Sequence, residues 1–146
     1  MVKKDLNYYQ TFITVAPDST ATAGQIPAAR GKKPTKVQIE YELLSANPYT
    51  YSQSELLFEV HVRHKAISQV DLEMEEEAFF AKSQACLRSS TLPKKLGWGI
   101  HFNKEGKIAL YGIGTPEYKQ FSENESGELK VFPAMRSSRK KNNGRS

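Results

Sequence analysis

The clearest alternation of apolar and polar residues lies between Gly97 and Ile113, where two runs rich in aromatic and β-branched side chains flank the polar segment 104–106. This pattern predicts a β-hairpin. A three-residue loop with Gly106 in the left-handed conformation puts the large apolar side chains on one face, which we expect to pack against the core. The predicted cross-strand pairs are Phe102 with Ile108, Ile100 with Leu110, and Trp98 with Gly112.

The other face of this hairpin carries two polar side chains, His101 and Tyr111. In the same register Tyr111 lies opposite Gly99 and can cover its bare backbone, with His101 as a diagonal neighbour. We therefore expect a core-facing apolar side and an opposite side whose imidazole and phenol point away from the core.

Two short strands and one long loop are predicted outside the hairpin. Residues 11–15 and 128–132 are rich in β-branched or aromatic side chains and are predicted to be strands. The prolines and glycines of residues 16–36 predict a loop, and loops of this length are often functional or mobile. A solvated basic surface is favoured for its second half, with an anion site near the next helix as the alternative. The basic residues are Arg30, Lys32, Lys33 and Lys36.

Two segments fit either a helix or a strand. Residues 35–46 alternate like a strand, but a threonine at their start can cap a helix and an asparagine–proline pair after them can end one, so we predict a helix. Residues 53–65 also alternate in part, yet Ser52 and Glu55 have the spacing of a capping box, which favours a second helix. The strand alternative stays open for both segments.

Residues 68–82 are predicted to form an acidic helix. Five carboxylates between Asp71 and Glu77 lie in its first half, where negative charge is stabilised by the helix dipole. An apolar stripe lies on one side, with Leu72 and Phe79 nearly opposite, so we expect the helix to bury parts of two sides. The stripe consists of Val70, Met74, Ala78 and Ala81.

The remaining segments complete an α+β domain. Residues 83–96 link the acidic helix to the hairpin, and residues 116–121 form a short helix that begins at a proline. We therefore predict helices packed on a small antiparallel sheet built around the hairpin. Three helices followed by a hairpin is also the element order of winged-helix domains, in which the third helix enters the DNA major groove. The chain resembles that order.

Composition places limits on the setting of the protein. The chain has 146 residues, enough for one domain with its own core, and its single cysteine, Cys86, excludes an internal disulfide. We find no signal peptide or membrane-spanning segment, so we expect a cytoplasmic protein without membrane contact. Four of the five net positive charges belong to residues 137–146, so residues 1–136, the predicted globular domain, carry +1. We expect the basic tail to be disordered and solvated rather than an arm that binds nucleic acid.

Few residues have the spacing of a metal or catalytic site. His61 and His64 could share one helix face, but no cysteine or acid stands at ligand spacing nearby, so we expect no metal and no other cofactor. Cys86 is a candidate nucleophile if His101 lies within hydrogen-bonding distance. A lone cysteine is more often a small buried residue, which makes this the weaker interpretation.

We favour a non-enzymatic binding module for nucleic acid or a protein partner. Phosphates would repel the acidic helix, so nucleic acid would have to meet the hairpin, the segment before it and the tail. The basic candidates in the hairpin and in the segment before it are Arg88, Lys94, Lys95, Lys104 and Lys107. The alternative is a small enzyme or ligand-binding protein with a polar pocket. Its candidate residues are Cys86, Arg88, His101 and Tyr111, with Arg136 brought in by the last strand.

Several short motifs are distinctive as a set. They are Tyr8-Tyr9-x-Thr11-Phe12-Ile13 with Ala16-Pro17-Asp18, Tyr41-Glu42-Leu43-Leu44-Ser45 with Asn47-Pro48-Tyr49, Cys86-Leu87-Arg88-Ser89, and Gly97-Trp98-Gly99-Ile100-His101. Together they resemble a family of small bacterial proteins known only as a domain of unknown function. The resemblance covers about residues 8–138 and implies a single-domain bacterial protein. It brings no activity and no catalytic residues.

Overall fold

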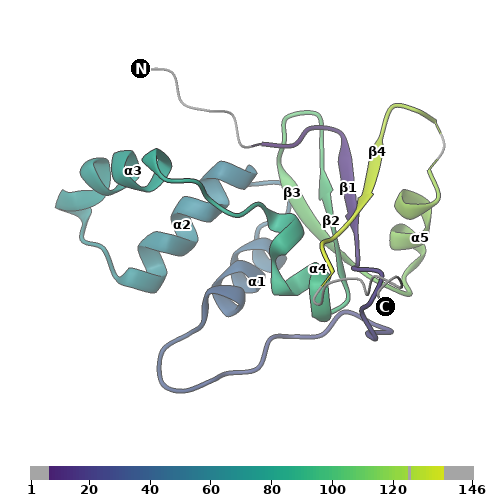
Figure 1. Ribbon diagram of the computed structural model, residues 1–146, viewed down its shortest axis with the longest axis horizontal. Helices are drawn as coiled ribbons and strands as arrows, with labels where there is room; N and C mark the ends of the chain where they lie inside the picture. Colours follow the sequence, from purple (N-terminus) through teal and green to yellow (C-terminus); the bar gives the residue numbers. More distant parts are fainter. Residues whose placement is uncertain (1–6, 125, 137–146) are drawn as a thin grey trace, which may run out of the picture.

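A computed structural model of the protein describes residues 7–124 and 126–136, so the predicted basic tail lies outside the described residues. Figure 1 shows helices arranged around a four-stranded sheet. In chain order the elements are β1 (Thr11–Thr14), α1 (Lys36–Ala46), α2 (Gln53–Lys65), η1 (Gln69–Asp71), α3 (Leu72–Ala81), η2 (Leu87–Ser89), α4 (Thr91–Lys95), β2 (Trp98–Phe102), β3 (Ile108–Gly112), α5 (Pro116–Ser122) and β4 (Lys130–Pro133).

The predicted hairpin is confirmed, and two more strands extend it. β2 and β3 pair in the predicted register, with Phe102 opposite Ile108, and Gly106 has a φ of 80° as the loop requires. β1 pairs antiparallel with β2 and parallel with β4, which gives the strand order β3-β2-β1-β4. The expectation of a purely antiparallel sheet was therefore wrong. A long connection through α5 lets the chain enter β4 in the same direction as β1.

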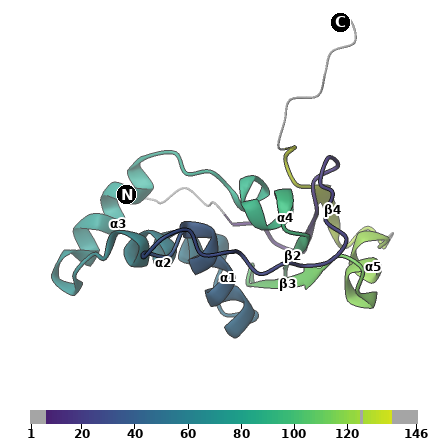
Figure 2. The ribbon, with the colours of Figure 1, turned by 90° about the horizontal axis from the view of Figure 1, so that it is seen from below.

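Helices cover both faces of the sheet (Figure 2). α1 and α4 lie on one side, where side chains such as Ile13, Ile100 and Phe102 form the main core with the helices. α5 lies on the other side, where the ring of Phe12 packs against Phe121 with centroids 5.1 Å apart. The hairpin face that carries the two predicted polar side chains is turned away from the main core. A small aromatic layer under α5, which the sequence did not predict, half-buries it.

Capping decides the two segments that fitted either a helix or a strand. At the start of α1 the Thr35 hydroxyl accepts a hydrogen bond from the Gln38 backbone nitrogen, and the Gln38 side chain accepts one from the Thr35 nitrogen. Ser52 and Glu55 exchange the same pair of bonds at the start of α2. Both segments are helices, as predicted, and the strand alternative is excluded.

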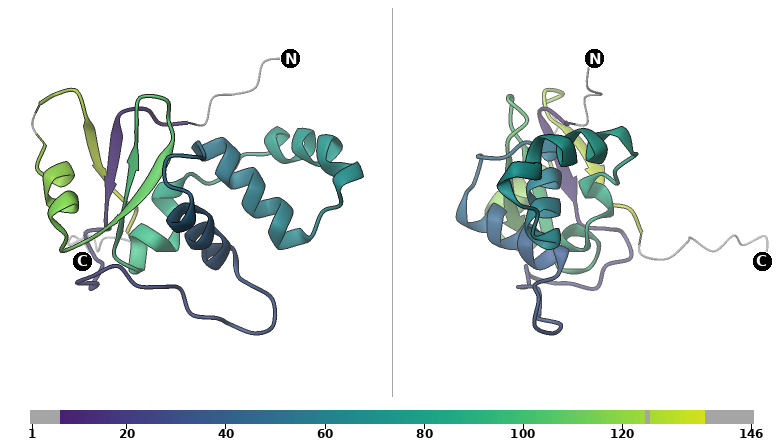
Figure 3. Two further views of the ribbon diagram at one scale, coloured as in Figure 1. Left: turned by 180° about the vertical axis from the view of Figure 1, so that it is seen from behind. Right: turned by 90° about the vertical axis from the view of Figure 1, so that its left-hand side faces the viewer.

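α2 and α3 form an arm that projects away from the sheet (Figure 3). The predicted acidic helix is confirmed as η1 followed by α3, and Phe79 of α3 packs on Phe58 of α2 with ring centroids 5.6 Å apart. The expectation that the apolar stripe is buried was wrong. Val70 is 90% exposed and Met74 66% exposed, because they lie on the side of the arm that faces away from α2.

The segment predicted as a plain link, residues 83–96, contains η2 and α4. The Ser90 hydroxyl accepts a hydrogen bond from the Leu92 nitrogen and caps α4, while Leu87 and Leu92 are fully buried in the core. Burial against β2 thus makes a five-residue helix that no local pattern predicts.

The α+β fold class is confirmed by this arrangement. The winged-helix resemblance is not confirmed and stays a prediction, since the hairpin is part of a four-stranded sheet rather than a separate wing. Within the described part of the chain, every helix is too short or too polar to cross a membrane.

Candidate functional site

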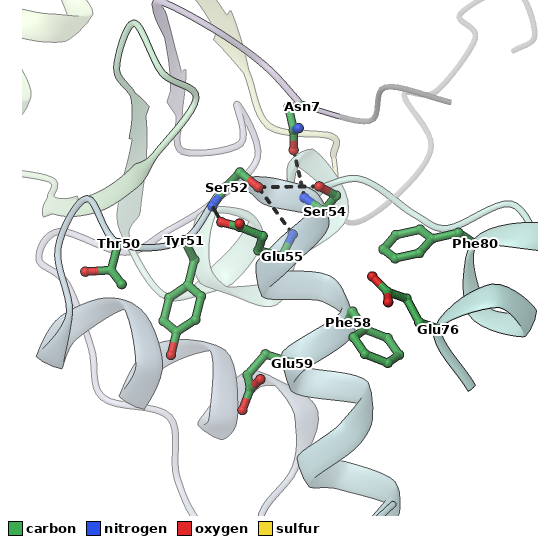
Figure 4. A pocket seen from close by; sticks show the side chains of 10 residues that line it. All are labelled: Asn7, Thr50, Tyr51, Ser52, Ser54, Glu55, Phe58, Glu59, Glu76 and Phe80. Atoms are coloured by element: carbon green, nitrogen blue, oxygen red, sulfur yellow. Dashed lines mark hydrogen bonds between the residues drawn. The ribbon is translucent and has the colours of Figure 1, made fainter. Parts of the chain in front are cut away.

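An open cleft of about 740 Å³ lies between α2, α3 and the turn before α2 (Figure 4). The capping box fixes the first residue of α2, so Glu55, Phe58 and Glu59 follow at spacings of three and four residues and line one wall. α3 contributes Glu76 and Phe80, which are one helical turn apart. The remaining lining residues are Asn7, Thr50, Tyr51, Ser52 and Ser54.

The carboxylates on the α2 wall are held in place by hydrogen bonds. Glu55 Oε1 accepts from the Ser52 backbone nitrogen and from Lys107 Nζ, both at 2.9 Å. The Ser52 bond, with a smaller effect from Lys107, lowers the pKa of Glu55, which is therefore charged at neutral pH. Glu59 Oε2 accepts from Arg63 Nε at 2.7 Å. Among the described residues that line the cleft there is no lysine or arginine.

Aromatic rings supply the apolar surface of the cleft. The ring of Phe58 lies 6.0 Å from that of Phe80 and 5.6 Å from that of Phe79, so the same rings hold α3 on α2. Figure 4 shows the carboxylate of Glu76 beside the rings of Phe58 and Phe80. A carboxylate next to an aromatic face suits a cation on an apolar stem, which is the chemistry of lysine and arginine side chains.

A second polar cluster lies on the α5 side of the sheet. The Tyr49 hydroxyl is hydrogen-bonded to His101 Nδ1 at 2.9 Å and to the Tyr111 hydroxyl at 2.7 Å. The ring of Phe121 stacks on the imidazole with centroids 4.2 Å apart. Burial lowers the pKa of His101, and burial, more than the hydrogen bond with Tyr111, raises the pKa of Tyr49, so the imidazole and the Tyr49 hydroxyl are both neutral at pH 7.

The backbone of Tyr49 has a φ of 57°, in the left-handed region that a side chain of this size rarely adopts. Its nitrogen donates to the Ile108 carbonyl at 2.7 Å, which anchors the turn to β3. The turn between α1 and α2 is thus tied to the sheet by the backbone of Tyr49 and by its hydroxyl. This strained position delivers the hydroxyl to the cluster.

A smaller cavity of about 180 Å³ lies between α1, α2 and the segment around η2. Its walls include Cys86, His61 and the carboxyl of Glu40, whose Oε1 accepts a hydrogen bond from Ser90 Oγ at 2.7 Å. Burial raises the pKa of Glu40 and outweighs the opposing effects of the Ser90 bond and of the Lys36 charge. The cavity therefore combines a partly buried acid with a thiol and an imidazole.

Comparison with known proteins gives a family but no activity. The model of DUF6157, a family of unknown function, matches residues 3–140. The chain belongs to this family. Among curated proteins and among solved structures no match is found. The DUF6157 match confirms the resemblance noted over residues 8–138, while the bacterial origin implied by that resemblance stays a prediction.

In this DUF6157 chain the two candidate catalytic residues lie on opposite faces of the sheet. Cys86 is on the side of the main core, where its Sγ accepts a hydrogen bond from the Tyr8 hydroxyl at 3.5 Å. His101 alternates along β2 with core residues and therefore faces α5. The structure brings His101 and Tyr111 together through Tyr49, but it does not bring either of them to Cys86.

The basic candidates of the DUF6157 chain are spread over several elements. Arg88 lies on the main-core side, where its Nε donates to the Pro133 carbonyl at 3.0 Å and its guanidinium lies 5.7 Å from the centroid of the Phe132 ring. Arg136 is exposed just after β4. Lys94 and Lys95 end α4, Lys104 is exposed in the hairpin loop, and Lys107 is bonded to the cleft carboxylate described above.

The described residues of this DUF6157 chain contain no group of three or more histidine, cysteine or acidic side chains that could hold a metal ion. His61 instead contacts Glu75 at 3.4 Å. The acidic cleft itself was missed by the sequence analysis. The spacing of Glu55, Phe58 and Glu59 after the capping box was a visible signal for one wall, but nothing local could show that α3 supplies the other.

Proposed function

We propose that this protein is a non-enzymatic binding module that holds a cationic segment of a protein partner in the cleft between α2 and α3. One observation carries the proposal: the cleft joins the carboxylates of Glu55, Glu59 and Glu76 to the rings of Phe58 and Phe80. Lys107 and Arg63, which pair with Glu55 and Glu59, are not among the residues that line the cleft, so its lining is acidic and aromatic. A lysine or arginine side chain can pair its charge with a carboxylate while its stem packs on the rings. The volume of about 740 Å³ is also within the range of binding pockets.

The same charges disfavour nucleic acid as the occupant of this cleft, because carboxylates repel phosphates. The basic candidates for a phosphate contact stand on α4, in the hairpin loop and near β4, and Lys107 already pairs with Glu55 at 2.9 Å. We therefore favour binding of a protein partner over binding of nucleic acid. The experiment below includes nucleic acid as an alternative ligand.

A ligand-binding or enzymatic role is the second candidate, and the cavity of about 180 Å³ favours it because both Cys86 and the partly buried carboxyl of Glu40 line it. Titration of the Cys86 thiol against pH with a thiol reagent tests its catalytic form. A thiolate that forms well below pH 8 supports that form, because reactive cysteines have lowered pKa values. An ordinary or inaccessible thiol contradicts it.

The main proposal is tested by titrating the full chain into two labelled peptides of equal length, one of lysine and leucine and one of glutamate and leucine. We expect only the cationic peptide to bind. Glu76→Lys should weaken binding about tenfold, because it replaces a cleft carboxylate with a cation: one attraction is lost and one repulsion is added, each about 0.5 to 1 kcal/mol. The matched control is Glu117→Lys on α5, which makes the same charge change on an exposed residue of the opposite side of the sheet.

Equal binding of both peptides, or equal weakening by both variants, would contradict the cleft as the site. Duplex DNA is the third probe, measured at low and high salt because phosphate contacts are salt-sensitive. If duplex DNA binds and Lys94→Glu with Lys95→Glu abolishes that binding while the cationic peptide does not bind, the nucleic-acid function replaces the one proposed here.

We also infer that residues 1–136 form a single domain in a reducing, cytoplasmic setting. The single cysteine supports the setting, because Cys86 is a free thiol and secreted domains of this size commonly use disulfides. Expression with the tail residues 137–146 removed tests the domain boundary, since an unchanged thermal unfolding midpoint is expected if the tail adds nothing to the fold.

A further inference from the structure

The apolar residues on the outer side of the arm are neither part of the core nor part of the cleft. Val70 is 90% exposed and Met74 66% exposed, and they lie one helical turn apart. Glu73, Met74 and Glu77 share one face of α3 at spacings of three and four residues, and Glu73 and Glu77 are exposed. Val70 lies in the turn η1 that leads directly into this helix. We call these four residues the outer face. Neighbouring exposed apolar side chains rimmed by charged residues are typical of surfaces that bind other proteins.

The loop before α1 carries the complementary chemistry. Ile26 is 73% exposed, and Arg30, Lys32 and Lys33 are all exposed. We call residues 26–33 the basic loop. In the left view of Figure 3 the basic loop runs along the lower edge of the molecule while the arm projects to the right. Each surface thus offers an apolar side chain with charges beside it, and the charges are of opposite sign.

We propose that the protein associates with itself head to tail, with the outer face of one copy docked on the basic loop of a second copy. Two outer faces cannot pair with each other, because Glu73 and Glu77 would oppose their own counterparts, and two basic loops repel for the same reason. The contact is therefore between different surfaces of the two copies. A head-to-tail pair leaves one free surface at each end, so further copies can add, and the assembly closes into a ring only where the rotation between copies permits.

The contact is small and depends on charge, so association is weak and sensitive to salt. The Debye length is about 8 Å at physiological ionic strength and about 3 Å at 1 M, which screens exposed charge pairs. The test is sedimentation velocity of the full chain over a concentration series at low and high salt. The mean mass should rise above 16.5 kDa with concentration at low salt and return to that value at high salt.

Charge reversal identifies the two surfaces. The face variant carries Glu73→Lys and Glu77→Lys, and the loop variant carries Lys32→Glu and Lys33→Glu. Each variant alone should stay monomeric, because its outer face and its basic loop then carry the same sign. An equimolar mixture should associate again, since each variant supplies the surface that complements the other. A third variant, Met74→Ser, should weaken association without changing net charge.

The control variant carries Glu117→Lys and Lys119→Glu on exposed positions of α5 and should associate like the unmodified chain. Circular dichroism of every variant checks the fold. A chain that is monomeric at low salt and high concentration overturns the proposal, as does association that survives both reversals. Failure of the mixture to associate also overturns it. Sedimentation is measured without peptide, so these outcomes do not report on the cleft, which is probed separately through Glu76→Lys. Glu73 and Glu77 lie one turn from Glu76 and Phe80, so the face variant is not used in the peptide titration.

Discussion

The hydroxyl of Tyr49 offers the sharpest test of how the α1–α2 turn is held on the sheet. It makes two half-buried hydrogen bonds, at 2.9 Å to His101 and at 2.7 Å to Tyr111. A hydrogen bond of this kind contributes about 1 kcal/mol net to the free energy of unfolding. Removing the Tyr49 hydroxyl also leaves His101 and Tyr111 without their hydrogen-bond partner. Tyr49→Phe should therefore lower the free energy of unfolding by about 2 kcal/mol, and Tyr111→Phe, which removes one bond, by about 1 kcal/mol.

The measurement is urea unfolding followed by circular dichroism, with thermal unfolding in parallel. For a chain of this size, 2 kcal/mol corresponds to a fall of about 6 °C in the unfolding midpoint. Tyr41→Phe is the matched control, because its ring packs on Trp98 at 5.6 Å while its hydroxyl makes no hydrogen bond to the described residues. We expect it to change stability by less than about 0.5 kcal/mol. Equal losses in the Tyr49 and Tyr41 variants would refute the reasoning.

Three further variants test other parts of the fold. Burial lowers the pKa of His101, so as pH falls the imidazole is protonated in the unfolded chain before it is protonated in the folded one. The free energy of unfolding should therefore decrease as pH drops below about 6.5. Urea midpoints measured from pH 7.5 to 5 should decrease less in His101→Gln than in the unmodified chain. Burial raises the pKa of Glu40, so the free energy of unfolding should decrease as pH rises through the pKa that this carboxyl has in the folded chain. Urea midpoints from pH 4 to 8 should show this decrease in the unmodified chain but not in Glu40→Gln. Gly99→Ala puts a Cβ 2.4 Å from Phe12 Cζ and 2.7 Å from the Tyr118 ring, so denaturant titration should show a loss of about 1 to 3 kcal/mol, and an unchanged midpoint would contradict the packing under α5.

Local rules predicted the elements that local interactions decide. The hairpin register follows from a two-residue alternation and a glycine that can adopt a φ of 80°, and both capping boxes lie within four consecutive residues. The helix that begins at Pro116 was predicted for the same reason. These elements could be placed from the sequence because the groups that decide them are neighbours along the chain.

Contacts between distant segments could not be predicted in this way. The positions of Val70 and Met74 showed which side of the acidic helix is apolar. They did not show that the described elements leave this side exposed. Tyr49 joins His101 from a turn 52 residues earlier in the chain, so the polar cluster was seen only in part. The parallel pairing of Thr11 with Lys130 depends on a connection that crosses most of the chain. Each of these depends on tertiary packing, which periodicity does not encode.

The place of β1 in the sheet suggests how the protein could be divided. This first strand lies between β2 and β4 and is hydrogen-bonded to both, while the basic loop that follows it is exposed over residues 28–33. A single cut in that loop would leave the N-terminal piece as the middle strand of a sheet whose other strands all belong to the second piece. Two separately made fragments should therefore recombine without a covalent link, and the loop is the natural point at which to split the chain into a reporter pair.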